Sequence, residues 1–203
     1  NTRRFGASFE KIKQVVDVRK GEIMFGLNMI VHKGRTIFVG DTSVHEYPSS
    51  DQMAQIAISA ARVVRLFGFD PKVAFVSHST FGQPLTSRTK HIKNAVEILK
   101  NKKVDFEFDG DMQPDVALDE EYKNLYPFSK IVGNANILIM PGQHSAAISY
   151  KMMKTLGDAK VIGPLLIGLG LPIEIAPLRS STSEILNLAS IAAYSADIID
   201  YEK

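Results

Sequence analysis

Hydroxyl-bearing and glycine residues follow several of the buried strands that the sequence predicts. Ser77, His78, Ser79 and Thr80 come directly after one such strand, residues 73–76. In an open parallel sheet, ligands bind beyond the carboxyl ends of the strands. Free N–H groups of the helices that start there favour an anion. The pattern predicts a site for a phosphorylated small molecule, and the alternative is a set of tight strand-to-helix turns.

A second group of such residues lies near the end of the chain. Gly163 and Pro164 follow a short apolar strand, where we favour a turn with close backbone packing. Arg179 and Ser180 stand just before the last predicted helix. A guanidinium beside free helix N–H groups suits a phosphate, but an arginine there can equally well bond loop carbonyls.

Other chemistries are excluded or disfavoured. The chain has no Cys, which excludes disulfides, iron–sulfur clusters, thiolate zinc sites and a cysteine nucleophile. It has no phosphate-binding loop of the Walker type and no nucleophile elbow. His78 and His144 lie at predicted strand ends, and a hydrogen-bonded structural role is favoured for each. Asp105, Glu107 and Asp109 alternate along a predicted strand, so we interpret them as a solvated face and expect no metal site.

Alternating helix-like and strand-like segments must position these residues. Periodicity and caps predict helices over residues 7–16, 51–67, 89–100, 119–125, 145–156 and 182–199. Ser181 and Glu184 form a capping box at the start of the last one. Strands are predicted over residues 22–31, 36–39, 73–76, 104–108, 137–140, 161–162 and 173–175. This order indicates an α/β fold with a mostly parallel sheet covered on both faces, in which the first two strands are the antiparallel exception.

Composition sets the class of protein. The 203 residues, 45% of them hydrophobic, suffice for one domain with its own core. The 24 basic and 22 acidic residues are interleaved and leave a net charge of +2, so no nucleic-acid partner is expected. No apolar run is long enough to cross a membrane, and the cysteine-free chain fits the cytoplasm. The chain begins with Asn and has no signal peptide, so we expect a fragment or a processed chain.

Several segments together resemble the phosphate acetyltransferase (phosphotransacetylase) family. The matching segments run in order along most of the chain: Val39-Gly40-Asp41-Thr42-Ser43-Val44, Pro71-Lys72-Val73-Ala74-Phe75-Val76-Ser77-His78-Ser79, Asp109-Gly110-Asp111-Met112-Gln113-Pro114-Asp115, Gly133-Asn134-Ala135-Asn136 with the following strand, and Val161-Ile162-Gly163-Pro164. More narrowly, Thr2-Arg3-Arg4-Phe5-Gly6 and Asp41-Thr42-Ser43-Val44-His45-Glu46 resemble the C-terminal phosphotransacetylase-like domain of large bacterial NADP-dependent malic enzymes.

This resemblance implies a three-layer α/β/α fold of the isocitrate dehydrogenase-like type. It also implies that residues 1–203 are the C-terminal two-thirds of such a domain, without its first lobe. A homodimer or higher oligomer would form through this part, and coenzyme A would bind in a cleft between the lobes. The catalytic domain in cis would hold NADP and Mg or Mn and would convert malate to pyruvate.

The chain departs from the family just before its last helix. Active members carry Ser and Arg where this sequence has Pro177 and Leu178, and Glu184 takes the position of the proposed base. Losing such donors costs on the order of 10²–10³ in rate each. The resemblance therefore implies an acetyl-CoA-sensing domain without catalytic residues, with acetyl-CoA as an effector at Ser77, His78, Ser79, Thr80, Gly163, Pro164, Leu178, Arg179, Ser180, Ser181 and Glu184. Two alternatives stay open, an active phosphate acetyltransferase that uses Arg179, and a mere assembly platform.

Overall fold

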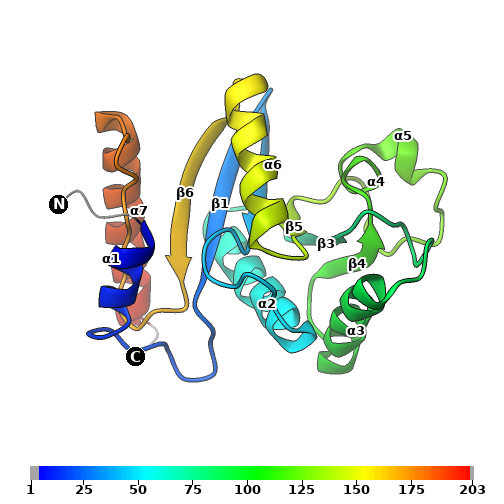
Figure 1. Ribbon diagram of the computed structural model, residues 1–203, viewed down its shortest axis with the longest axis horizontal. Coiled ribbons are helices and arrows are strands. Elements are labelled where there is room, and N and C mark those ends of the chain that lie inside the picture. The colour runs from blue at the N-terminus through cyan, green and yellow to red at the C-terminus, as the bar shows by residue number, and fades with distance from the viewer. Residues whose placement is uncertain (1–4, 202–203) are drawn as a thin grey trace.

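A six-stranded sheet with helices on both faces forms the computed structural model, which describes residues 5–201 (Figure 1). The strand order is β4-β3-β5-β2-β1-β6. The strands are β1 Phe25–His32, β2 Arg35–Gly40, β3 Lys72–Val76, β4 Glu107–Met112, β5 Ile137–Ile139 and β6 Lys160–Ile167. The helices are α1 Phe5–Ile12, α2 Ser50–Leu66, α3 Ser87–Lys102, α4 Pro114–Leu118, α5 Glu120–Lys123, α6 Gln143–Leu156 and α7 Thr182–Tyr201.

One strand runs against the others. β1 pairs antiparallel with β2 and with β6, whereas β2, β3, β4 and β5 pair parallel with one another. The short turn at Lys33-Gly34 makes the β1–β2 hairpin, since both residues have the positive φ that such turns need. The prediction of a mostly parallel sheet with an early antiparallel pair is confirmed. Because β6 returns to the common direction, five of the six strands end at the same edge.

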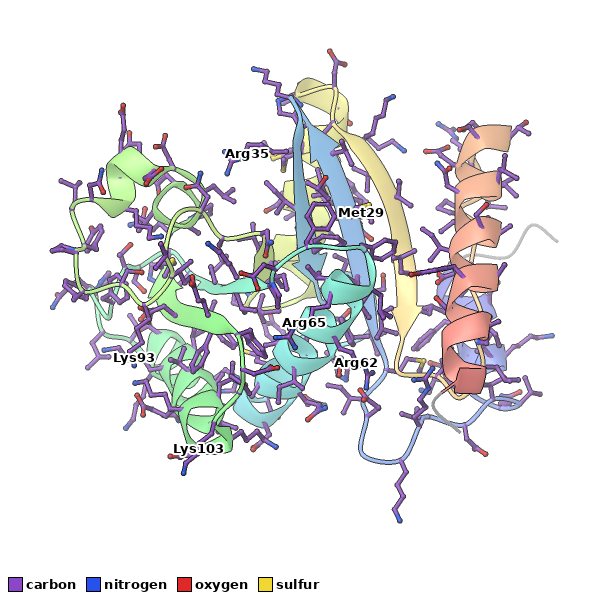
Figure 2. The ribbon with its side chains drawn as sticks, turned by 180° about the vertical axis from the view of Figure 1, so that it is seen from behind. Met29, Arg35, Arg62, Arg65, Lys93 and Lys103 are labelled. Carbon is purple, nitrogen blue, oxygen red and sulfur yellow. The ribbon has the colours of Figure 1, made fainter. Side chains whose placement is uncertain are left out.

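Two apolar layers fill the space between the sheet and the helices. One packs α2 and α3 against one face, around Phe25, Phe38 and Phe75. The other packs α4 and α6 against the opposite face, around Ile30 and Leu138. Figure 1 shows α6 over one face, and Figure 2, from behind, shows α2 over the other. The expected three-layer α/β/α architecture is confirmed.

The last helix covers the edge of the sheet. α7 lies beyond β6 in both views, and only Leu188 among its described side chains is buried in the main core (Figures 1 and 2). Its ends reach neighbouring helices through Lys154–Glu184 and a hydrogen bond from Tyr194 to the carbonyl of Leu66. Two cavities lie between α7 and its neighbours, and residues of β6 line both of them. No helix within residues 5–201 combines the length and the apolar character that a membrane span requires.

Helix starts follow local capping chemistry. The predicted capping box at α7 is confirmed, because Ser181 Oγ accepts from Glu184 N while Ser181 N donates to Glu184 Oε2. The N-cap of α2 is Ser49, and that of α3 is Thr86. In both cases the hydroxyl accepts a hydrogen bond from the backbone N–H three residues ahead, so α2 begins one residue and α3 two residues before the predicted start.

Three strand predictions are wrong. Residues 173–175 form no strand. β4 begins later and ends later than predicted, so Asp109 and Asp111 lie within it. Asp109 is buried rather than solvated, because its carboxylate accepts from the backbone N–H groups of Gly110 and Lys130. Gly163 and Pro164 lie inside β6 and not at a strand end, so the predicted close backbone packing occurs without a turn.

Candidate functional site

A cavity of about 220 Å³ lies between α6, β6 and the start of α7. Five of the residues selected from the sequence line it: Gly163, Pro164, Arg179, Ser180 and Glu184. They come from two separate segments, the middle of β6 and the stretch formed by the loop before α7 and the first turn of α7. The fold brings them together because α7 packs along β6 at the edge of the sheet.

A bulge in β6 shapes the floor of this cavity. Leu27 pairs with Leu165 and Met29 with Ile162, so Gly163 and Pro164 together face Asn28. Gly163 has φ +126°, and a Cβ there would lie 2.8 Å from Asn28 Oδ1. Only glycine fits this backbone, because a side chain would collide with β1.

Three further polar side chains reach the cavity from α6, and the sequence analysis missed them. They are Tyr150, Lys151 and Lys154. Tyr150 and Lys154 are four residues apart and therefore share a helix face. The spacing of Tyr150 and Lys154 within the predicted helix 145–156 is the sequence signal that could have identified them. Lys151 and Lys154 on α6 therefore add two positive charges to that of Arg179 at this cavity.

Glu184 is held as a carboxylate by three donors. Ser181 N donates to Oε2 over 2.7 Å, Ser181 Oγ donates over 3.0 Å, and Lys154 Nζ lies 2.9 Å from Oε1. The backbone N–H of Ser181, followed by the Lys154 ammonium, lowers the pKa of this carboxyl to about 2. A carboxylate with so low a pKa is a weak general base at neutral pH. Its geometry serves the helix cap and the contact between α6 and α7.

The other residues selected from the sequence lie elsewhere. Ser77, Ser79 and Thr80 are buried at the end of β3, where Ser79 Oγ donates to Asp111 Oδ2 and contacts Ser77 Oγ. β3 and β6 are four strand spacings apart, roughly 19 Å. His78 is exposed beside this buried group. The set chosen from the sequence therefore divides into two separate places in the structure.

Two selected residues near the cavity do not line it. The side chain of Leu178 is exposed, and Ser181 is occupied as the cap of α7. Among the histidines, His144 is exposed and lies 3.4 Å from Glu46. His91 bonds Ser50 Oγ and the carbonyl of Pro48 and thereby ties α3 to the start of α2 and the loop before it.

The loop after β2 is built around one buried carboxylate. Asp41 Oδ1 accepts from the N–H groups of Gly26, Ser43 and Val44, and Oδ2 accepts from His45 N. The ring Nδ1 of His45 lies 2.7 Å from Oδ2. All of these contacts are within the protein and fix the backbone of this loop.

A second cavity, about 80 Å³, lies on the other side of α7 between α2 and the end of β6. Its walls are mostly apolar and include Phe67, Leu169 and Ile191. Glu174 also lines it and accepts one hydrogen bond from Leu166 N. Burial raises the pKa of the Glu174 carboxyl to about 8, which the Leu166 N–H opposes only in part. Glu174 is therefore largely protonated at neutral pH.

Stability is expected to depend on pH through Glu174. The folded state holds its proton up to about pH 8, while the unfolded chain releases it near 4.5. The free energy of unfolding therefore falls as pH rises between these values and is flat beyond them. Glu174→Gln should equal the wild type in stability at pH 4 and become progressively more stable than it as the pH rises to 8. Urea unfolding between pH 4 and 9 measures this.

The matched control for that experiment is Glu10→Gln, because Glu10 is solvent-exposed. Its unfolding free energy should follow the wild type at every pH. If Glu174→Gln also follows the wild type across the whole range, the carboxyl does not titrate in the way that its burial requires.

Comparisons with known proteins bear on this site. The sequence signature of a family described as "Phosphate acetyl/butaryl transferase" matches residues 3–193. The NADP-dependent malic enzyme of Rhizobium meliloti (strain 1021) is 43% identical over 195 residues, which are 96% of this chain and 26% of that enzyme. The phosphate acetyltransferase of Clostridium acetobutylicum is 37% identical over 162 residues, 79% of this chain and 49% of that protein.

A solved phosphotransacetylase from Streptococcus pyogenes has the same fold. It matches with a TM-score of 0.89 and 28% identity, over 96% of this chain and 60% of that one. The chain spans about a quarter of the length of the malic enzymes it matches. The resemblance stated from the sequence motifs is confirmed by these findings.

Proposed function

Because this chain belongs to the phosphate acetyl/butaryl transferase family, we propose that it is the acetyl-CoA-sensing and oligomerisation domain of an NADP-dependent malic enzyme and transfers no acetyl group itself. The malate, NADP and Mg or Mn sites would lie in another domain of that cytoplasmic enzyme. Acetyl-CoA bound here would shift the equilibrium between two states of the whole enzyme. The malic enzymes among the relatives support the choice of parent.

The observation that carries this proposal is the chemistry of the α6–β6–α7 cavity. It offers Lys151 and Arg179 to an anion, while Lys154 is paired with Glu184. Coenzyme A carries phosphates that cations of this kind bind. The same cavity offers no suitable base, because the carboxylate of Glu184 is held by Ser181 and Lys154. Binding without catalysis is what this arrangement supports.

Oligomerisation is supported by exposed apolar side chains on two helices. On α7, Ile185 and Leu186 are 50% and 64% exposed. On α6, Ile148, Met152 and Leu156 are exposed at a spacing of four residues, which makes one stripe. Apolar surfaces of this kind are usually covered in the assembled protein.

A second candidate function is phosphate acetyltransferase activity, in which Arg179 replaces the missing arginine and Glu184 acts as base. Both residues do line one cavity, and phosphate acetyltransferases are among the relatives. Formation of acetyl phosphate from acetyl-CoA and phosphate by the full-length enzyme tests it. A rate well above the protein-free background would establish this function and overturn the proposal of a domain that does not catalyse.

The proposal itself is tested by titrating malate oxidation with acetyl-CoA. The full-length enzyme should reduce NADP with malate, and acetyl-CoA should change that rate. Malate oxidation that ignores acetyl-CoA would leave only the assembly role. Absence of malate oxidation would remove the malic enzyme as parent.

Arg179 is expected to contribute to effector binding in that enzyme. Arg179→Ala should raise the acetyl-CoA concentration for half-maximal effect about tenfold, because a charged hydrogen bond to an anion is lost. Malate turnover without acetyl-CoA should stay unchanged. Arg65→Ala is the control. Arg65 lies on α2, which covers the other face of the sheet, and pairs there with Asp105 (Figure 2). An unchanged response in Arg179→Ala would exclude this residue from the binding site.

A further inference from the structure

One amide beneath the cavity has an unused donor. Asn28 lies in β1, opposite the bulge at Gly163 and Pro164, and is fully buried. Its Oδ1 accepts a hydrogen bond from Thr42 Oγ1 over 3.3 Å. Its Nδ2 has no hydrogen-bond partner among the residues that the structure describes. An unpaired buried donor is costly, so its presence calls for a partner that completes the site.

Tyr150 is the neighbour that can use this amide. It lines the cavity from α6, and its phenol is close enough to Asn28 to interact with it, although no hydrogen bond of normal geometry joins them. Burial raises the pKa of Tyr150, and the interactions with Asn28 and Lys154 oppose that rise only in part. The phenol therefore keeps its proton at neutral pH.

The two groups make a directional donor once they align. An amide N–H that donates to the phenol oxygen leaves the phenol O–H free to donate in turn. Asn28 is buried in β1 whereas Tyr150 lines the cavity, so a phenol that accepts from Asn28 keeps its O–H for a ligand in that cavity. A neutral donor of this kind suits a neutral oxygen acceptor. The phosphates of a ligand suit Lys151 and Arg179 better, because these carry charge.

We propose that Tyr150, supported by Asn28, recognises the acyl carbonyl oxygen of the effector and so distinguishes an acyl thioester from free coenzyme A. This inference rests on the proposed function, since it assigns the acyl end of the same ligand. Tyr150 is a specificity residue and not a catalytic one, because hydrogen bonding to the carbonyl requires no bond to break. The cations would bind both ligands alike, whereas Tyr150 would bind only the one with a carbonyl.

Calorimetry on the full-length malic enzyme separates these roles. Three ligands are compared, acetyl-CoA, free coenzyme A and S-ethyl-CoA, a thioether that keeps the chain length but lacks the carbonyl oxygen. The wild type should bind acetyl-CoA about fivefold more tightly than S-ethyl-CoA, the effect of one neutral hydrogen bond. Tyr150→Phe should lose that preference and bind S-ethyl-CoA and coenzyme A as the wild type does.

Tyr194→Phe is the matched control, because the Tyr194 hydroxyl bonds the Leu66 carbonyl at the other cavity. It should keep the fivefold preference. Equal binding of acetyl-CoA and S-ethyl-CoA by the wild type overturns the inference, even if Tyr150→Phe fails to fold, and leaves the proposed function intact. A Tyr150→Phe variant that weakens all three ligands equally also overturns it. No binding of acetyl-CoA by the wild type removes the inference and the sensing role together.

Discussion

Asp41→Ala is expected to destabilise the fold by about 3–5 kcal/mol, the largest effect of any substitution considered. The carboxylate accepts from four backbone N–H groups, those of Gly26, Ser43, Val44 and His45. Alanine leaves these donors without an acceptor, one of them at the buried Gly26 and three in a half-buried segment. Each buried unsatisfied group costs about 1–3 kcal/mol, and entry of water into the relaxed loop offsets part of the sum.

Urea unfolding of wild type and variant at one pH measures this loss. Asp105→Ala serves as the control, because it removes an acid whose side chain is 78% exposed and whose ion pair with Arg65 lies at the surface. Such a pair contributes about 0–1 kcal/mol. If both variants lose the same small amount, the hydrogen bonds of Asp41 do not hold the loop together.

Gly163→Ala is expected to cost about 2–4 kcal/mol and to disturb the cavity as well. A Cβ at this position would lie 2.8 Å from Asn28 Oδ1 and 2.9 Å from the Leu27 carbonyl, and the φ of +126° is itself unfavourable for alanine. The collision separates β6 from β1 at the bulge. Binding of acetyl-CoA by the full-length enzyme should therefore weaken together with stability.

Gly34→Ala separates strain from collision. Gly34 has φ +76° in the hairpin turn, but a Cβ there meets nothing within 4 Å. Only the conformational cost, about 1–2 kcal/mol, applies. Thermal unfolding of both variants should show the larger loss for Gly163→Ala. Equal losses would mean that β1 and β6 adjust around the bulge without cost.

Local chemistry made much of the fold predictable. The start of α7 depends on Ser181 and Glu184, which are three residues apart, so the sequence contains all the information for that capping box. The turn at Lys33-Gly34 is likewise decided by adjacent residues. The mostly parallel sheet followed from the alternation of apolar strands and helices, a pattern that each segment carries by itself.

The composition of the site depends on contacts that no local pattern contains. Ser77 and Arg179 each looked suited to an anion, but their separation depends on the strand order, in which β5, β2 and β1 lie between β3 and β6. The alternation of acidic and apolar residues predicts a solvated Asp109. In the fold, however, the backbone N–H of Lys130 donates to its carboxylate from a loop that is distant in sequence. Tyr150 and Asn28 meet only after α6 has packed over the sheet.

The position of β1 between β2 and β6 has a consequence for synthesis of the protein. β1 is complete on both sides only when β6, the last strand within residues 5–201, pairs with it. A ribosome releases the β1–β2 hairpin long before that, so the nascent chain carries an apolar strand with unpaired N–H and C=O groups along one edge. Such an edge can pair with a second nascent chain. A product that stops before Lys160 keeps this edge permanently and is exposed to aggregation, whereas a chain that continues through α7 covers the edge with β6 and places α7 over the new edge.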